Sequence, residues 1–168
     1  MQYARSHIVF HWLTAVLVLG LVGSGLAFSF ELAGKGALNA HQIMGQALIV
    51  VVALRILTRI ARAPAPADLG HAAWERRLAG AVHLGLYGLL IAFIVTGYVS
   101  ASALSSNMLL FPADLAFARS DTGETLLEVH YALKWALLAL FGLHFAGAMK
   151  HMLIDRDDTF SSMWFSKT

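Results

Sequence analysis

The chain has 168 residues, of which 58% are hydrophobic and only 13% are charged, and its mean hydropathy is +0.68. A soluble domain normally carries about 25% charged residues, so this composition excludes an ordinary soluble enzyme, a disordered segment and a nucleic-acid-binding module. The pI near 9.2 then reflects charges in the loops of a membrane protein.

Four long stretches are nearly free of charge. Asp, Glu, Lys and Arg are absent from residues 8–30, 36–54 and 78–113, and residues 129–149 contain only Lys134. About 20 mainly apolar residues cross the ~30 Å of hydrocarbon in a bilayer. The sequence therefore predicts four transmembrane helices, at about 7–30, 41–62, 77–103 and 125–154.

The connections between these helices differ in length. We interpret the first helix as a retained span, because it is too long for a signal peptide and lacks a basic start and a cleavage site. A short link at 31–40 follows it. The second link, 63–74, contains Pro64 and Pro66, which end a helix. The third link, 104–124, is the longest, and its apolar residues predict a short helix at the membrane surface.

Basic residues are divided unequally between the two ends of the predicted bundle. Nine lie on one side: Arg5, Arg55, Arg59, Arg62, Arg76, Arg77, Lys150, Arg156 and Lys167. Three lie on the other: Lys35, Arg119 and Lys134. Cytoplasmic loops carry the excess of Lys and Arg, so we expect both termini in the cytoplasm. No internal repeat is present, which indicates a single four-helix domain over residues 1–168.

The chain has no cysteine and eight histidines. Disulfides, iron–sulfur clusters and the C-x-x-C-H attachment of c-type haem are therefore excluded. The last predicted helix contains His130, His144 and His151. The first two are 14 residues apart, which is about 21 Å of helical rise, and their rings leave the same face.

The expected depths of the histidines form two layers. An outer layer contains His41 and His130, and an inner layer contains His11, His83, His144 and His151. A haem iron takes two axial ligands from facing helices, whereas zinc takes three or four ligands at one depth. The outer layer thus favours haem, and depth alone leaves the inner ligand pair open. We expect His7 and His71 to be solvated or interfacial.

Two further patterns have two interpretations each. Glycines in the first three helices leave room for a flat macrocycle, or serve ordinary packing of helices in lipid; they are Gly20, Gly23, Gly25, Gly45, Gly80, Gly85, Gly88 and Gly97. Arg55, Arg59 and Arg62 share one helix face and suit either haem propionates or a cytoplasmic anchor. We favour the anchor.

Several short motifs together resemble the bacterial cytochrome b-561 family, which is related to the cytochrome b subunits of nickel–iron hydrogenases and formate dehydrogenases. In chain order they are Ser6-His7-Ile8-Val9-Phe10-His11-Trp12, Asn39-Ala40-His41 followed by Gly45 and Arg55, Ala81-Val82-His83-Leu84-Gly85-Leu86-Tyr87, Val129-His130, Gly142-Leu143-His144 and His151. The ordered set covers almost the whole chain.

The resemblance implies an all-α membrane protein, a four-transmembrane-helix bundle enclosing two b haems in the bacterial plasma membrane. It implies that His11 and His144 hold the iron of the cytoplasmic haem. His41 and His130 correspondingly hold the iron of the periplasmic haem. It also places His83 and His151 at a quinone site beside the inner haem.

We therefore expect an oxidoreductase that exchanges electrons between the periplasmic face and the ubiquinone pool, with superoxide as a candidate donor. Lys134 lies one turn beyond His130, where it is suited to attract an anion. We favour the alternative, in which Lys134 contacts a propionate or is a snorkelling interfacial lysine. Two other functions remain open: a membrane subunit that takes electrons from a periplasmic dehydrogenase, and a transporter, which the scarcity of acidic residues in the spans disfavours.

Overall fold

The computed structural model describes residues 5–61, 71–103 and 116–164. Within these residues the chain forms four long helices: α1 (Arg5–Ser29), α2 (Lys35–Ala61), α3 (Ala73–Ala103) and α4 (Asp121–Lys150). All four are long and apolar enough to cross a membrane. The predicted all-α fold with four membrane-spanning helices is confirmed.

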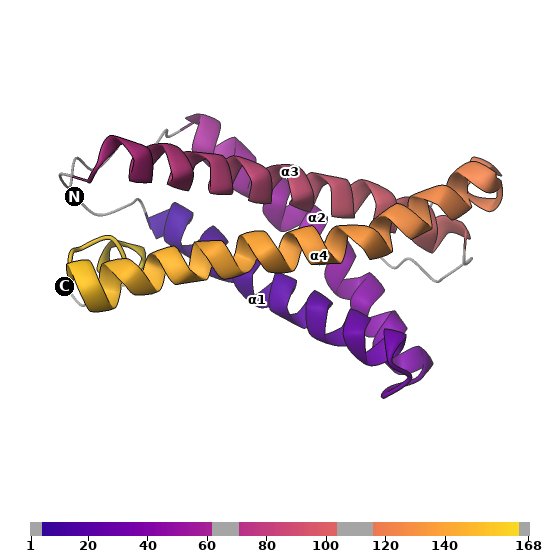
Figure 1. Cartoon of the computed structure of the whole chain (residues 1–168). Coiled ribbons are helices and arrows are strands. Elements are labelled where there is room, and N and C mark those ends of the chain that lie inside the picture. The colour runs from indigo at the N-terminus through magenta and orange to yellow at the C-terminus, as the bar shows by residue number, and fades with distance from the viewer. Residues whose placement is uncertain (1–4, 62–70, 104–115, 165–168) are drawn as a thin grey trace.

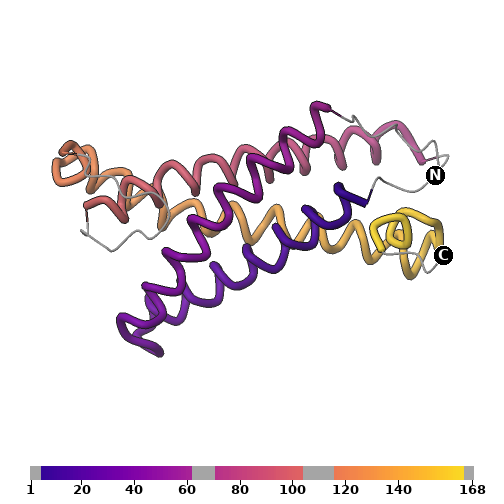
Figure 2. Tube along the Cα trace, turned by 180° about the vertical axis from the view of Figure 1, so that it is seen from behind, coloured from indigo at the N-terminus to yellow at the C-terminus, as the bar shows by residue number. Residues whose placement is uncertain are grey.

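The helices form two antiparallel pairs that cross each other. α1 packs along α2, and α3 packs along α4, while the contact of α2 with α3 is less extensive. The two pairs separate toward the end that carries the α1–α2 connection (Figure 1, Figure 2). The start of α1 and the end of α4 lie together at the opposite end. The bundle is therefore an assembly of two hairpins.

All four helices begin earlier than the hydropathy pattern predicts, α1 by two residues and the other three by four or more. α2 begins at Lys35 instead of residue 41, α3 at Ala73 instead of 77, and α4 at Asp121 instead of 125. These first turns are more polar than the spans that follow them, and hydropathy detects only the part that lies in hydrocarbon. Carboxylates in the first turns of α3 and α4 favour these starts through the helix dipole.

The connections are only partly described. In the third one, Ala116–Arg119 forms a single 3₁₀ turn. The rest of the surface helix predicted there, and the segment with Pro64 and Pro66, lie outside the described residues. After α4 the chain continues through a π-helical turn, His151–Asp155, and a 3₁₀ turn, Ser161–Met163.

A small apolar core lies between the two ends of the bundle. It takes residues from all four long helices: Val18, Leu48, Val52, Leu90 and Leu137. Large apolar side chains such as Ile60, Leu84 and Trp135 are instead more than 65% exposed. An apolar exterior is the expected surface of a bundle whose solvent is lipid. The core separates two groups of histidines, one toward each end.

Candidate functional site

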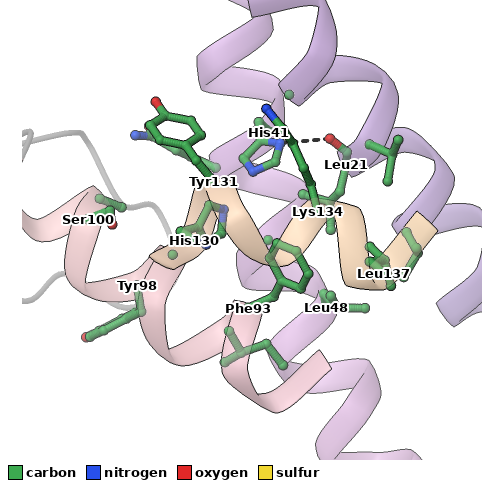
Figure 3. Close-up of a pocket in the computed structure, with 18 of the residues that line it drawn as sticks. Leu21, His41, Leu48, Phe93, Tyr98, Ser100, His130, Tyr131, Lys134 and Leu137 are labelled. Atoms are coloured by element: carbon green, nitrogen blue, oxygen red, sulfur yellow. Dashed lines mark hydrogen bonds between the residues drawn. The ribbon is translucent and has the colours of Figure 1, made fainter. Parts of the chain in front are cut away.

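Two histidine rings face each other at the end of the bundle that carries the α1–α2 connection, which we call the His41 end. His41 on α2 and His130 on α4 have ring centroids 6.2 Å apart, with their planes at 84°. Both rings lie at the wall of one cavity (Figure 3). The juxtaposition of these two residues, expected from their depths, is confirmed.

Hydrogen bonds fix the tautomer of both rings. The Nδ1 of His41 lies 2.9 Å from the carbonyl oxygen of Leu21, which only accepts, so this nitrogen carries the proton. The hydroxyl of Thr96 donates to the Ala92 carbonyl and therefore accepts from Nδ1 of His130 at 2.9 Å. In both rings Nε2 is left with its lone pair. Histidine ligands of metals are commonly oriented in this way.

Glycines make room for the two rings. A Cβ built on Gly25 would lie 3.2 Å from Cε1 of His41, and one built on Gly97 would lie 2.9 Å from Cε1 of His130. Gly25 is on α1 and Gly97 is on α3, so each ring rests against the backbone of a neighbouring helix. At these two positions the glycines make room for a histidine ring, and the expected room for a flat macrocycle stays a prediction. At Gly23, Gly80 and Gly88 a Cβ meets no atom within 4 Å.

The cavity beside these rings has a volume of about 440 Å³ and a mainly apolar lining. All four long helices contribute to the lining, including Phe93 and Leu137. Lys134 also lines the cavity, and its Nζ lies 5.4 Å from the ring centroid of Trp135 and 5.9 Å from that of Tyr131. Lys134 thus adds a positive charge to the lining of a mainly apolar cavity that the rings of His41 and His130 also line.

Three histidines meet at the opposite end, which we call the His11 end. The ring centroids of His11 on α1 and His144 on α4 are 6.2 Å apart, and that of His83 on α3 is 5.1 Å from His144. The Nδ1 of His83 donates to the carbonyl of Ala79 at 2.6 Å, so its Nε2 also keeps a lone pair. His83 is exposed at the bundle surface, whereas His11 and His144 are half-buried.

Arg55 is integrated into this group. Its Nε donates to the hydroxyl of Tyr87 at 2.9 Å, and its Nη2 donates to Nδ1 of His11 at 3.2 Å. A guanidinium only donates, so Nδ1 of His11 accepts and Nε2 carries the ring proton. Arg55 is thus half-buried against a histidine, a contact that the favoured interpretation as a cytoplasmic anchor did not include. That interpretation stays a prediction, and Arg62 lies outside the described residues.

His151 and His71 belong to a separate cluster beyond the end of α4. Asp157 Oδ2 accepts from Nδ1 of His151 at 2.8 Å and from Nε2 of His71 at 2.9 Å. The ring centroids of the two histidines are 4.5 Å apart. His71, expected to be solvated or interfacial, is therefore not simply solvated, and its interfacial position stays a prediction. His151 has its ring contact with His71 rather than within the group around His144.

The charge of Asp157 is well stabilised. Burial raises the pKa of its carboxyl group, but hydrogen bonds from Thr159, His71 and His151 outweigh that effect and hold the pKa well below its usual range. The tail that carries Asp157 also reaches α1, since Trp12 Nε1 donates to the Met163 carbonyl at 2.8 Å. Sequence reasoning missed this cluster because its members are joined only by the folded-back tail.

His7 also differs from expectation. Both of its ring nitrogens are buried and, within the described part of the chain, have no hydrogen-bond partner. Of the two alternatives expected for His7, solvated or interfacial, the structure contradicts the solvated one. The four-residue spacing from His11, which puts both on one helix face, was the available signal.

The chain is similar to known proteins over almost its whole length. The profile of the family described as prokaryotic cytochrome b561 matches residues 2–166. A curated relative, cytochrome b561 homolog 2 of Escherichia coli (strain K12), is 30% identical over 171 residues. That alignment covers 96% of this chain and 90% of the relative. The similarity thus includes all four helices and both groups of histidines.

Proposed function

Because the chain belongs to the prokaryotic cytochrome b561 family and is a multi-pass membrane electron-transfer protein, we propose that it holds two b haems, one at each end, and exchanges electrons with ubiquinone. The family implies b-type haem. The observation that carries the proposal is that two histidine rings face each other at each end of the bundle. The ring centroids are 6.2 Å apart for His41 with His130 and for His11 with His144.

The donor chemistry of the His41 end fits a haem iron. Imidazole nitrogen is a common axial ligand of haem, and both rings offer an Nε2 lone pair beside an apolar cavity. When bound, such a haem supplies a one-electron iron couple. The chain's own contribution is the carbonyl of Leu21 and the hydroxyl of Thr96, which hold the two rings in the required tautomer.

At the His11 end, we assign His11 and His144 as the ligand pair. Nε2 of His11 carries a proton while Arg55 donates to Nδ1, so ligation through Nε2 requires Arg55 to leave that nitrogen. The guanidinium is then available to a carboxylate group such as a propionate, for which its planar fork is suited. Tyr87, which accepts from Arg55 Nε, holds the side chain nearby.

The proposed orientation puts the His41 end on the non-cytoplasmic side, as the distribution of Lys and Arg favours. There Lys134 faces the cavity and is suited to attract a small anion such as superoxide. Two superoxide anions each give up one electron and become dioxygen. One ubiquinone takes those two electrons with two protons and becomes ubiquinol.

The proton requirement favours a quinone site near the His11 end. His83 and His151 each hold Nδ1 in a hydrogen bond to an acceptor, Ala79 and Asp157 respectively. Their Nε2 atoms are thus free to accept a proton and to donate it to a quinone oxygen. His83 is exposed at the bundle surface, where a lipid-soluble quinone could reach it.

The test is to count haem. We expect two non-covalent b haems per purified chain, extractable by acid-acetone, with bis-histidine low-spin spectra. His41→Ala and His130→Ala should each remove only the haem at the His41 end. His11→Ala and His144→Ala should each remove only the haem at the His11 end. A ratio near one in the wild type contradicts the paired assignment. Quinone reduction by the purified chain with superoxide separates this function from that of a dehydrogenase subunit.

A further inference from the structure

A second group of metal-binding side chains lies outside both histidine pairs. We propose that His71, His151 and Asp157 form a binding site for a divalent cation of the zinc class, at the His11 end of the bundle. One ligand atom of each residue lies within 4.8 Å of the other two. The proposed site shares His151 with the proposed quinone site, but it uses Nδ1 of that ring and not Nε2.

The three ligands come from three separate parts of the chain. His71 precedes α3, His151 opens the π-helical turn after α4, and Asp157 lies in the tail. Arg156 between them has a left-handed backbone with φ of 53°, and the N–H of Asp157 donates back to the His151 carbonyl at 3.2 Å. The π turn and the reversal at Arg156 therefore return the Asp157 carboxylate to the His151 ring. π-helical turns are frequent at functional sites.

The donor set selects the class of ion. Two imidazole nitrogens and one carboxylate oxygen suit Zn²⁺, whereas Ca²⁺ and Mg²⁺ prefer oxygen ligands alone. Zinc bonds of about 2.0–2.2 Å in tetrahedral geometry separate neighbouring ligand atoms by about 3.3 Å. Nδ1 of His151 and Nε2 of His71 lie 2.8 Å and 2.9 Å from Asp157 Oδ2, so each needs to move outward by only a few tenths of an ångström.

The site is open enough for an ion and a water ligand to enter. The side chains of His151, His71 and Asp157 are 17%, 19% and 20% exposed. Zinc sites with three protein ligands keep a fourth position for water. Asp157 Oδ1 accepts from the Thr159 backbone N–H at 2.8 Å, which orients the carboxylate while leaving Oδ2 toward the two rings.

Neighbouring charges are compatible with a cation. Lys150 is paired with Glu75 at 2.9 Å and with Asp155 at 2.5 Å, so its charge is balanced locally. Asp155 Oδ2 also lies 3.1 Å from Nδ1 of His151 and adds negative charge beside the ligands. Arg76 donates to the backbone carbonyl of His71 at 2.6 Å, which orients the residue without occupying its ring.

The test is zinc binding to chelator-washed, haem-loaded protein without a polyhistidine tag, measured by isothermal titration calorimetry with ZnCl₂. Haem-loaded protein is used so that rings in the two histidine pairs do not compete. We expect one Zn²⁺ per wild-type chain, and at least about tenfold weaker binding in His71→Ala and Asp157→Asn, each of which lacks one ligand. Asp158→Asn is the matched control, since that carboxylate bonds Ser161 instead, and it should bind zinc like the wild type.

Equal zinc affinity in the wild type, His71→Ala and Asp157→Asn overturns the proposal, as does the lack of stoichiometric binding in the wild type. Because either variant can also disturb the tail, the wild type provides a second measurement. Its zinc X-ray absorption spectrum should contain outer-shell scattering from two imidazole rings. Scattering from one ring or none contradicts the assigned ligands, whatever the variants do.

Discussion

The ring of His130 rests against the backbone of Gly97, so closely that a Cβ at position 97 would lie 2.9 Å from Cε1 and 3.4 Å from Nδ1 of the ring. This contact, together with the hydrogen bond to Thr96 one residue earlier, sets the direction of Nε2. The α3 backbone therefore positions a side chain of α4.

The Gly97 contact predicts a selective loss of haem. In Gly97→Ala the new methyl group displaces the His130 ring, and overpacking of this kind costs about 1–3 kcal/mol. We expect a lower content of the haem at the His41 end, measured as haem per chain and by redox titration. Gly88→Ala on the same helix is the control, because its Cβ meets no atom within 4 Å. Equal haem loss in both variants would show that the effect is general helix destabilisation.

Thr96 is expected to tune the ligand rather than to hold the fold. Thr96→Val keeps the side-chain shape but removes the oxygen that accepts from His130 Nδ1. The imidazole becomes a poorer electron donor, so the midpoint potential of that haem should rise, and affinity should fall by about 10–100-fold. Ser100→Ala serves for comparison, since its hydroxyl donates to the Thr96 carbonyl and, among the described residues, not to His130. An unchanged potential would remove Thr96 from the haem site.

Arg55 is predicted to act at one end of the bundle only. Arg55→Ala should alter the spectrum and potential of the haem at the His11 end and leave the other haem unchanged, because Arg55 contacts His11 and Tyr87. Arg59→Ala removes the same charge from the same helix and should have a smaller effect, since Arg59 lies over the Tyr87 ring without bonding His11. Potentiometric titration of both variants makes the comparison. Matching shifts at the two ends would mean that Arg55 acts only through net charge.

Lys134 is predicted to accelerate the encounter with a small anion. Lys134→Glu should slow haem reduction by superoxide by roughly 2- to 10-fold at low ionic strength. Added salt should slow the wild type, since charges are screened beyond ~8–10 Å. The control is Lys35→Glu, which carries the same charge change at the start of α2. Pulse radiolysis measures the rates, and an unaltered rate with intact haem assigns Lys134 to packing against Tyr131 and Trp135.

The quinone assignment predicts variants that keep both haems. In His151→Ala and His83→Ala, stopped-flow measurement should show slower haem reduction by ubiquinol, because a proton acceptor is lost while the ligand pairs remain. Haem spectra of the oxidised proteins are recorded first. Wild-type rates in both variants would place the quinone elsewhere, and loss of haem would identify that histidine as a ligand.

Hydropathy and helical spacing were enough to predict the four spans and the depths of the histidines. They could not predict contacts that form because the chain reverses after α4. Four spans followed from charge-free stretches, and His41 opposite His130 followed from depth. Depth placed His144 in the same layer as His11 but left the inner pair open, and only the family resemblance singled out these two rings, which lie 6.2 Å apart. The return of Asp157 to His151 depends on a left-handed Arg156. Glycine commonly marks such a position, so the arginine gave no signal there.

Arg55 illustrates a second limit. A run of arginines with helical spacing near a span end is typical of a cytoplasmic anchor, and hydropathy does not distinguish an arginine that points outward from one that points inward. Tyr87, which lies 32 positions later on α3, accepts a hydrogen bond from Arg55 and draws it into the bundle. Only the packing of α2 against α3 brings these two residues together.

The two-hairpin arrangement has a consequence for how the protein is made. Each facing pair of rings takes one histidine from the α1–α2 hairpin and one from the α3–α4 hairpin. A ligand bound between either pair therefore joins halves that otherwise touch less extensively than the helices within each hairpin do. We therefore expect insertion and maturation to be separate stages, in which the two hairpins enter the bilayer first and haem binding then joins them. Cells starved of haem should accordingly accumulate an inserted but loosely joined precursor that is open to proteolysis.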